Sequence, residues 1–146
     1  MTAQELYRTD FFEWTQRNAE LLSRGCFDLA DIAHIAEELA DMGARDQREV
    51  KSYLRRLILH LLKWQMQPSK RSPSWQTSIG NSRSALKDIF EQSPSLRRLA
   101  VQSVPKIYAD TRQRAAAETG LVRSAFPLEC PYTFAQLMQI DFYPVD

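Results

Sequence analysis

Several side chains in the middle of the chain have types and spacing that can bind a ligand or a partner. A helical segment would place an imidazole, an ammonium group, an indole and an amide on one face. The residues of this polar-aromatic corner, with the neighbours that can complete it, are His60, Lys63, Trp64, Gln67, Arg71, Trp75 and Arg83. The guanidinium of Arg71 or Arg83 can bind a carboxylate or phosphate through paired hydrogen bonds. The alternative is structural, with Trp64 and Trp75 packed as a clasp and His60 hydrogen-bonded near the core.

A second group of side chains has the spacing of metal ligands. His34, Glu37 and Glu38 stand at positions i, i+3 and i+4, which puts an imidazole and carboxylates on one helix face. Di-iron bundles use Glu-x-x-His on two helices, whereas here the order is reversed and the chain holds only 2 histidines. In the other interpretation, Glu37 or Glu38 pairs with a cation such as Arg48 or Arg83. A metal-dependent enzyme is therefore a further alternative, not the leading hypothesis.

No other pattern typical of catalysis occurs in the sequence. The 4 glycines are each isolated, so no phosphate-binding or dinucleotide-binding loop can form. A Gly-x-Ser-x-Gly nucleophile elbow is absent. Cys26 and Cys130 have neither metal-type nor redox-type spacing, and a reducing cytosol would keep them as thiols. We therefore predict no cofactor and name no catalytic residue, which favours a non-catalytic protein.

Charge is distributed unevenly along a chain whose formal net charge is only +1. Residues 1–50 carry a net charge of −6, residues 51–114 carry +10, and residues 115–146 carry −3. The basic block 51–114 can serve a nucleic acid, because phosphate neutralisation supplies most non-specific affinity. It can equally bind an acidic protein partner or pair with the acidic segment of its own chain. We expect pairing between the acidic and basic segments of the chain to cancel most of their electrostatic field.

Capping signals and apolar periodicity divide the chain into helical segments. The predicted helices cover 3–24, the segment from Asp28 to about Gly43, the run after that glycine up to Gln67, 73–92, and Pro94 to Gly120. Average helix lengths favour a break at Gly43 over one long bent helix, which stays an alternative. Thr133 and Gln136 have capping-box spacing for one short helical turn. The aromatic residues of the tail FYPVD should dock it.

These elements predict an all-α fold. No segment alternates apolar and polar residues over enough positions for a strand. We expect a single domain, 1–146, built as a helical bundle of about five main helices with a short C-terminal helical turn and an extended tail. No apolar run is long enough to span a membrane, and the start lacks the features of a signal peptide. We therefore expect a cytoplasmic protein without a membrane partner.

Several strings, in this order, resemble a bacterial family catalogued as domain of unknown function number twenty-nine. They are LYRTDFFEWTQ near the start, AEELADMG at 36–43, HLLKWQMQPSKRSPSW at 60–75, PSL at 94–96, ET at 118–119 and FPLECPYT at 126–133. The resemblance runs over nearly the whole chain. It implies a compact, mostly helical bacterial domain and brings no activity, cofactor or catalytic residue.

The leading hypothesis for function is a small cytoplasmic module for protein interaction. Its partner is another protein or a second copy of the chain in a homodimer, because acidic and basic faces suit pairing by charge complementarity. The polar-aromatic corner is its expected contact surface. A nucleic-acid-associated protein that uses the basic block 51–114 is the alternative from a different class.

Overall fold

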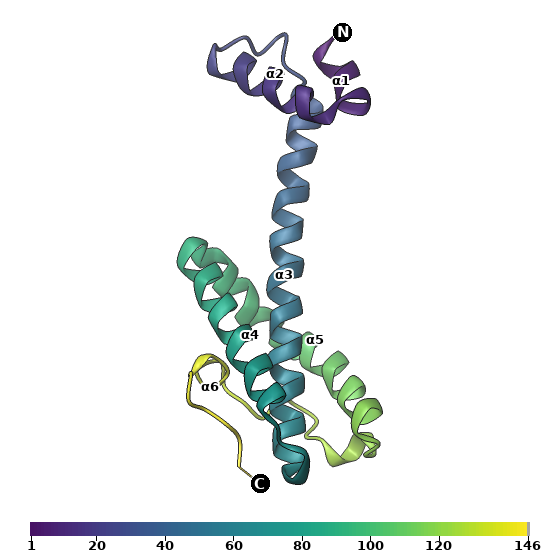
Figure 1. Cartoon of the computed structure of the whole chain (residues 1–146), viewed down its shortest axis with the longest axis vertical. Helices are drawn as coiled ribbons and strands as arrows, with labels where there is room; N and C mark the ends of the chain where they lie inside the picture. Colours follow the sequence, from purple (N-terminus) through teal and green to yellow (C-terminus); the bar gives the residue numbers. More distant parts are fainter. Residues whose placement is uncertain (146) are drawn as a thin grey trace. The chain divides into compact units, whose positions relative to one another are not determined.

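A computed structural model describes residues 1–145, and every regular element in that range is a helix, as the sequence predicts (Figure 1). Contacts within the chain gather in two compact units, Met1–Asp46 and Gln47–Asp146. α3 (Ile32–Met66) contributes its first turns to one unit and its later turns to the other. The expectation of a single domain over 1–146 stays a prediction.

In the first unit, the helix predicted over 3–24 is in fact two helices, α1 (Ala3–Thr9) and α2 (Phe11–Ser23). The prediction of one helix was wrong because Asp10 interrupts it. The Asp10 side chain accepts a hydrogen bond from the Glu13 amide at 3.1 Å and so caps α2. An aspartate that bonds to a nearby amide competes with the helical backbone, which favours caps over helix interiors.

α3 (Ile32–Met66) runs without a break through Gly43, so the favoured break at this glycine was wrong. A glycine in a helix interior costs only about 1 kcal/mol relative to alanine, and good helix formers surround it on both sides. The predicted start of this helix at Asp28 was also wrong. α3 begins after Asp31, whose side chain lies 3.4 Å from the His34 amide nitrogen that donates to it.

In the second unit, the predicted boundaries are confirmed closely. α4 (Pro73–Gln92) is capped by the Ser72 hydroxyl, which accepts from the Trp75 amide at 3.3 Å. α5 (Pro94–Thr119) ends at Gly120, whose φ of +75° is the left-handed conformation that glycine adopts without strain. Short 3-10 turns, Pro68–Lys70 and Arg123–Ala125, precede α4 and follow α5.

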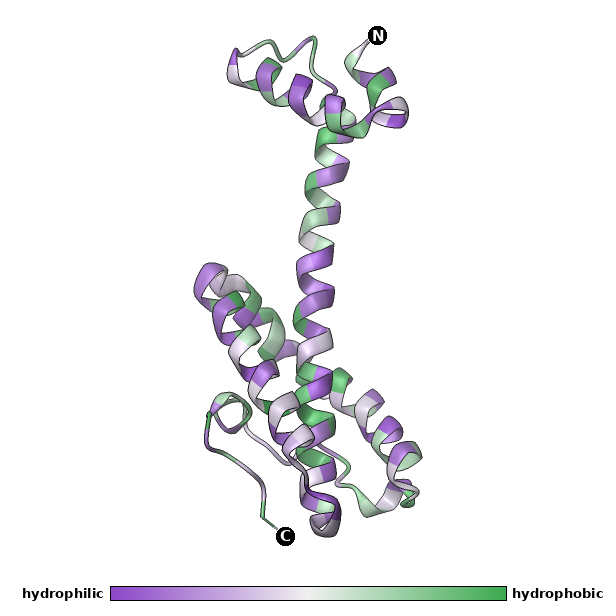
Figure 2. Ribbon diagram, in the orientation of Figure 1, coloured by the Kyte–Doolittle hydropathy of each residue, from purple (hydrophilic) through white to green (hydrophobic). Residues whose placement is uncertain are grey.

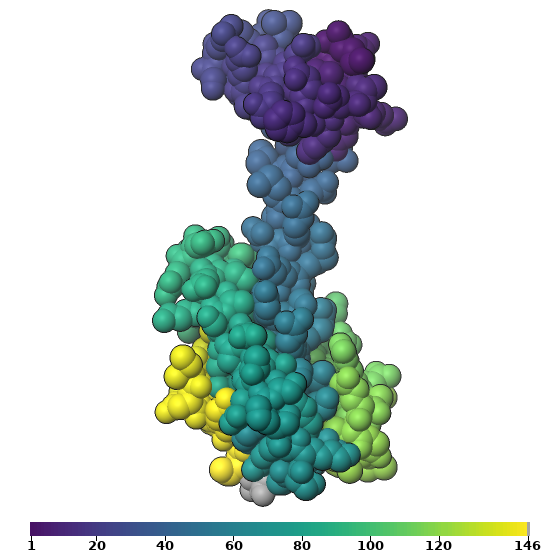
Figure 3. Space-filling view, viewed as in Figure 1, coloured from purple at the N-terminus to yellow at the C-terminus, as the bar shows by residue number. Residues whose placement is uncertain are grey.

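The core of the second unit lies where the later turns of α3 meet α4, α5 and the C-terminal segment. Leucine and isoleucine side chains of α3 supply much of it. Its fully buried residues include Leu54, Leu57, Ile58, Leu61, Leu62, Ile79, Leu86 and Leu137. Thr133 and Gln136 form the expected capping box of α6 (Phe134–Met138). Figure 3 shows the yellow C-terminal segment lying against the teal surface of α4.

Within the described range, no helix is both long and apolar enough to cross a bilayer.

Candidate functional site

The structure brings part of the polar-aromatic corner together. Lys63 of α3 places its Nζ 5.4 Å from the ring centroid of Trp75 on α4. The Arg71 guanidinium carbon lies 5.0 Å from the ring centroid of Trp64, and Arg71 Nε donates to the Trp64 carbonyl at 2.7 Å. These cation–π contacts hold the end of α3, the intervening turn and the start of α4 to one another. The geometry favours the structural interpretation of the corner.

Arg83 is engaged by the C-terminal segment. Its side chain is buried, and three backbone carbonyls accept from it: Leu137 from Nε at 2.7 Å, Gln136 from Nη2 at 3.3 Å and Ile140 from Nη1 at 3.4 Å. Burial lowers the pKa of the Arg83 guanidinium. Its Cζ also lies 5.7 Å from the Tyr143 ring, which in turn packs on Trp64 with centroids 4.8 Å apart. Arg83 therefore fastens the tail, and its hydrogen-bonding groups face the protein.

His60 and Gln67 take separate positions. His60 Nδ1 lies 2.8 Å from the Arg56 carbonyl of its own helix, and burial, with a smaller effect of Lys63, lowers the pKa of its imidazole. Gln67 stands before the 3-10 turn without a capping hydrogen bond from its side chain. Helical spacing placed both residues near Lys63 and Trp64, but among the described residues no side-chain hydrogen bond joins either of them to another side chain of the corner.

His34 belongs to a polar network inside the first unit. Its Nδ1 lies 2.7 Å from Asp31 Oδ2, and its ring stacks on that of Tyr7 with centroids 3.8 Å apart. Trp14 Nε1 donates to the same Asp31 oxygen at 3.0 Å. Burial disfavours the charged form of Asp31, yet the hydrogen bonds from Trp14 and His34 outweigh it and hold the pKa of this carboxyl below its ordinary value.

Glu38 extends this network, while Glu37 does not join it. Glu38 Oε1 accepts from the Tyr7 hydroxyl at 2.5 Å; this bond, together with burial, raises the pKa of Tyr7 to about 12. Glu37 is exposed. Nowhere in residues 1–145 do three His, Cys, Asp or Glu side chains gather to hold a metal ion. The arrangement around His34 thus gives no support to the metal-site hypothesis.

An apolar face of the first unit is open, and sequence reasoning did not anticipate its exposure. Helical periodicity put Ile32, Ile35, Leu39 and Met42 on one face, as expected of a core. In the structure Leu39 is 63% exposed, Met42 55% and Ile32 50%, while Ile35 is half-buried. Figure 2 shows hydrophobic colour on the first turns of α3. We call Ile32, Ile35, Leu39 and Met42 the α3 seam.

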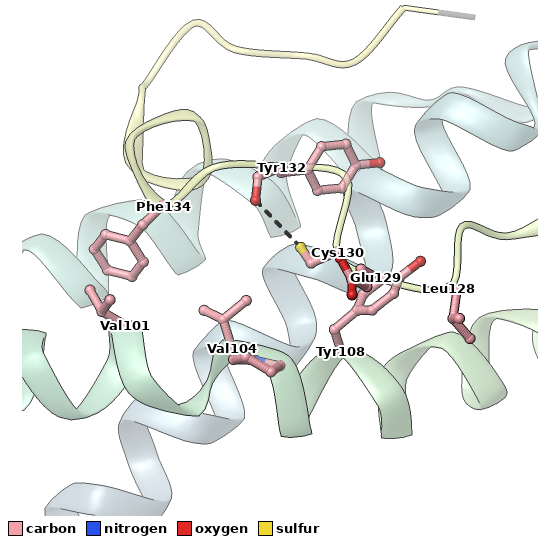
Figure 4. A pocket seen from close by; sticks show the side chains of 9 residues that line it. Val101, Val104, Tyr108, Leu128, Glu129, Cys130, Tyr132 and Phe134 are labelled. Atoms are coloured by element: carbon pink, nitrogen blue, oxygen red, sulfur yellow. Dashed lines mark hydrogen bonds between the residues drawn. The ribbon is translucent and has the colours of Figure 1, made fainter.

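A second feature missed from sequence is a groove of about 500 Å³ between α5 and the segment 126–134 (Figure 4). Val104, Leu128 and Phe134 line it, and Cys130 Sγ lies 3.6 Å from the Tyr132 carbonyl. Burial raises the pKa of the Cys130 thiol. The thiolate is the reactive form of cysteine, so burial lowers the reactivity expected of Cys130 at neutral pH. The resemblance string FPLECPYT, which supplies one wall, was the signal that could have pointed to it.

The two units carry opposite charge. Residues 1–46 hold 4 basic and 10 acidic side chains, for a net charge of −6, and residues 47–146 hold 15 and 8, for +7. Ion pairs within the described range are local: Glu20 with Arg24, Asp31 with His34, and Glu118 with Arg114. The expected internal cancellation of charge stays a prediction.

Together these features define the class: an all-helical protein of two compact units, with an open apolar seam and no metal-binding cluster in the described residues. The chain belongs to the family described as domain of unknown function DUF29, whose model matches residues 6–143. The resemblance drawn from the sequence is thereby confirmed. No curated protein and no solved structure matches the chain.

Proposed function

We propose that this protein is a non-catalytic interaction module of the cytoplasm that self-associates through the α3 seam. The observation that carries the proposal is the exposure of Leu39 and Met42, at 63% and 55%, on the first turns of α3. Contiguous exposed apolar side chains mark interaction sites, because water contact with them is unfavourable. The free thiols Cys26 and Cys130 fit a reducing compartment.

The seam has the spacing of a coiled coil. Its members follow one another at intervals of three, four and three residues, which are the a and d positions of a heptad. Such a repeat packs best against another helix whose side chains enter the spaces between its own. Asp46 occupies the next position of the repeat and ends the seam after about three turns. The contact is therefore short, and the dimer should dissociate on dilution.

Charge decides the relative direction of the two helices. In a parallel pair in register, Asp46 of each copy would face Asp46 of the other across the seam, which is unfavourable. In an antiparallel pair with Leu39 opposite Met42 of the second copy, the flanking Glu38 lies opposite the second copy's Arg45. The symmetry repeats this pair, so two complementary contacts form at once. An antiparallel second copy is thus the occupant that the charges favour.

The flank of the seam opposite Glu38 and Arg45 carries small residues, which allow two helix backbones to approach each other closely. Ala36 and Gly43 lie there, and the same antiparallel register sets Ala36 opposite Gly43 of the second copy. A side-chain carbon added at Gly43 would meet nothing within 4 Å in the isolated chain. This open space leaves room for a neighbouring helix backbone. It also gives a reason for a glycine in the interior of a long helix.

Sedimentation equilibrium over a range of concentrations tests the proposal. We expect a monomer–dimer equilibrium for the unaltered protein and a monomer for Leu39→Asn. Glu38→Arg should weaken the dimer at least tenfold, and Glu38→Arg combined with Arg45→Glu should restore it. The matched control is Glu37→Arg, the exposed neighbour outside the seam, which should leave the equilibrium unchanged.

Circular dichroism establishes first that each variant is folded. A protein that stays monomeric at millimolar concentration would overturn self-association. A dimer that survives Leu39→Asn would show that a different surface is used. Failure of the double charge reversal to restore the dimer, with both single variants folded, would exclude the antiparallel register.

A further inference from the structure

The groove of Figure 4, which lies entirely within the second unit, has mostly apolar walls. Its volume of about 500 Å³ suits a small molecule. The apolar residues that line it are Val101, Val104, Pro105, Leu128 and Phe134. Leu128 is 79% exposed, and apolar surface that stays open along a hollow is unfavourable in water and marks a binding site. We call this hollow the Pro105 groove; it shares no residue with the α3 seam.

The side-chain hydrogen-bond donors of the Pro105 groove are already engaged within the protein. The Tyr108 hydroxyl donates to the Pro127 carbonyl at 2.6 Å, and the Tyr132 hydroxyl donates to Gln65 Oε1 at 2.7 Å. The Cys130 thiol donates to the Tyr132 carbonyl over 3.6 Å. Burial raises the pKa of Tyr108 to about 12, so this hydroxyl keeps its proton at neutral pH. The lining therefore offers a ligand no unengaged side-chain donor.

Pro105 leaves a backbone acceptor in the wall of the groove. Proline has no N–H, so the Val101 carbonyl, four positions earlier in α5, lacks the helical hydrogen bond that residue 105 would otherwise donate. Both residues line the groove. A carbonyl that lacks its helical partner beside apolar walls favours a ligand with an N–H group.

Charge gives a second, independent indication of the ligand. Among the described residues that line the groove, Glu129 alone carries a charge, and no described residue forms an ion pair with it. Arg97 lies outside the lining, with its Cζ 5.1 Å from the ring centroid of Phe134. Like charges repel, so a cationic group is favoured near Glu129 and disfavoured near Phe134. The groove therefore selects a ligand with one positive end.

We propose that the Pro105 groove binds a small amine whose apolar body carries a second N–H donor, as in an arylalkylamine with an indole ring. The ammonium group would donate to the Glu129 carboxylate. The ring would lie against Val104 and Phe134, and its N–H would donate to the Val101 carbonyl. Such a ligand covers the open apolar surface and uses both acceptors.

Other classes of ligand match the lining less well. An organic anion would face the Glu129 carboxylate and find no unengaged side-chain donor. A metal ion would find a single carboxylate, since residues 1–145 hold no cluster of three metal-ligating side chains. A peptide segment presents a carbonyl for nearly every N–H, and its carbonyls would stay unpaired here. A small molecule with donors only is the better complement.

Isothermal titration calorimetry on the full chain tests the proposal with four probes: tryptamine, 1-methyltryptamine, indole-3-propionate and the blocked peptide N-acetyl-Phe-Leu-Lys-amide. We expect saturable binding of tryptamine and none of indole-3-propionate, which has a carboxylate in place of the ammonium group. 1-Methyltryptamine, which lacks the ring N–H, should bind roughly fivefold more weakly because one hydrogen bond is lost. The blocked peptide should bind more weakly than tryptamine.

Two substitutions assign the contacts. Glu129→Gln should weaken tryptamine binding about tenfold, because a charge-assisted hydrogen bond becomes a neutral one. The matched control is Asp110→Asn, an exposed carboxylate of α5 outside the groove, which should change nothing. Pro105→Ala supplies the missing N–H to the Val101 carbonyl. This variant should be at least as stable to urea and should bind tryptamine and 1-methyltryptamine equally.

Several outcomes would overturn the proposal. They are no saturable binding of tryptamine, saturable binding of indole-3-propionate, and equal losses from Glu129→Gln and Asp110→Asn. A preference for tryptamine over 1-methyltryptamine that survives Pro105→Ala would exclude the Val101 carbonyl as an acceptor. Tighter binding of the blocked peptide than of tryptamine would identify a protein segment as the occupant. Because the groove shares no residue with the α3 seam, loss of self-association would not affect these results.

Discussion

The buried guanidinium of Arg83 donates from Nε to the backbone carbonyl of Leu137, 2.7 Å away and 54 positions later in the chain. This bond and its neighbours attach the last helix and the tail to α4. Because a charged donor satisfies several carbonyls at once, the C-terminal segment needs no sheet or long helix of its own to stay in place. Arg83 is thus a structural residue, although its residue type had suggested anion binding.

Removing the hydrogen bonds of Arg83 to the C-terminal segment should destabilise the second unit. We expect Arg83→Met to lower the free energy of unfolding by about 3 kcal/mol, since several charge-assisted hydrogen bonds are lost and buried carbonyls are left unpaired. Urea unfolding followed by tryptophan fluorescence measures the change. Lys87→Met, an exposed cation on the same helix, should change it by less than about 0.5 kcal/mol. Equal effects of the two substitutions would show that the hydrogen bonds of Arg83 do not stabilise the second unit.

Acid should weaken the network around Asp31. Its pKa is below the ordinary value in the folded state, so its contribution to stability is complete above about pH 4 and is lost as pH falls through the folded pKa. Urea unfolding between pH 2 and 7 should therefore show a steeper loss for the unaltered protein than for Asp31→Asn. Asp28→Asn, at an exposed position three residues earlier, serves as the control. Parallel profiles for the unaltered protein and Asp31→Asn would show that Asp31 titrates normally.

Alanine in place of Gly43 should stabilise the monomer. The position lies inside a continuous helix, and the added carbon meets nothing within 4 Å. Replacing an interior glycine by alanine should therefore raise the free energy of unfolding by about 1 kcal/mol. Measurement below the dimer dissociation range isolates this effect. Destabilisation would indicate that α3 bends or breaks at this residue.

The thiol of Cys130 should react slowly. Burial raises its pKa, and alkylation proceeds through the thiolate. In a Cys26→Ser background, iodoacetamide labelling at pH 7 should be at least several-fold slower than that of a free cysteine peptide and should accelerate as pH rises. Fast labelling at neutral pH, measured by intact-protein mass spectrometry, would show an activated thiol and reopen a catalytic role for the groove in Figure 4.

The sequence predicted the elements of the second unit better than those of the first. Pro73 after Ser72, and Gly120 after a long periodic run, are local signals whose effect does not depend on distant contacts. The division at Asp10 and the continuity at Gly43 were misjudged, because small differences in local free energy decide both. An aspartate can cap a new helix or lie inside a longer one, and a glycine can end a helix or lie within it. The residue type alone does not decide between these outcomes.

The candidate sites also include some features that the sequence predicted and others that it did not. Residue types and spacing identified the polar-aromatic corner. In the structure, Lys63 contacts Trp75 and Arg71 contacts Trp64. They could not show that Arg83 would turn to Leu137, a residue 54 positions away, since periodicity describes one helix at a time. Nor could they show which apolar face stays open.

The amino-acid sequence by itself thus determined the all-helical class, most helix ends and the opposite charges of the two parts of the chain. These follow from local propensity, capping and composition. Only the tertiary structure decided that the α3 seam is exposed, that Arg83 is buried against the C-terminal segment and that Pro105 and Glu129 line one groove. Burial and convergence depend on which helices pack together, and that is a property of the whole folded chain.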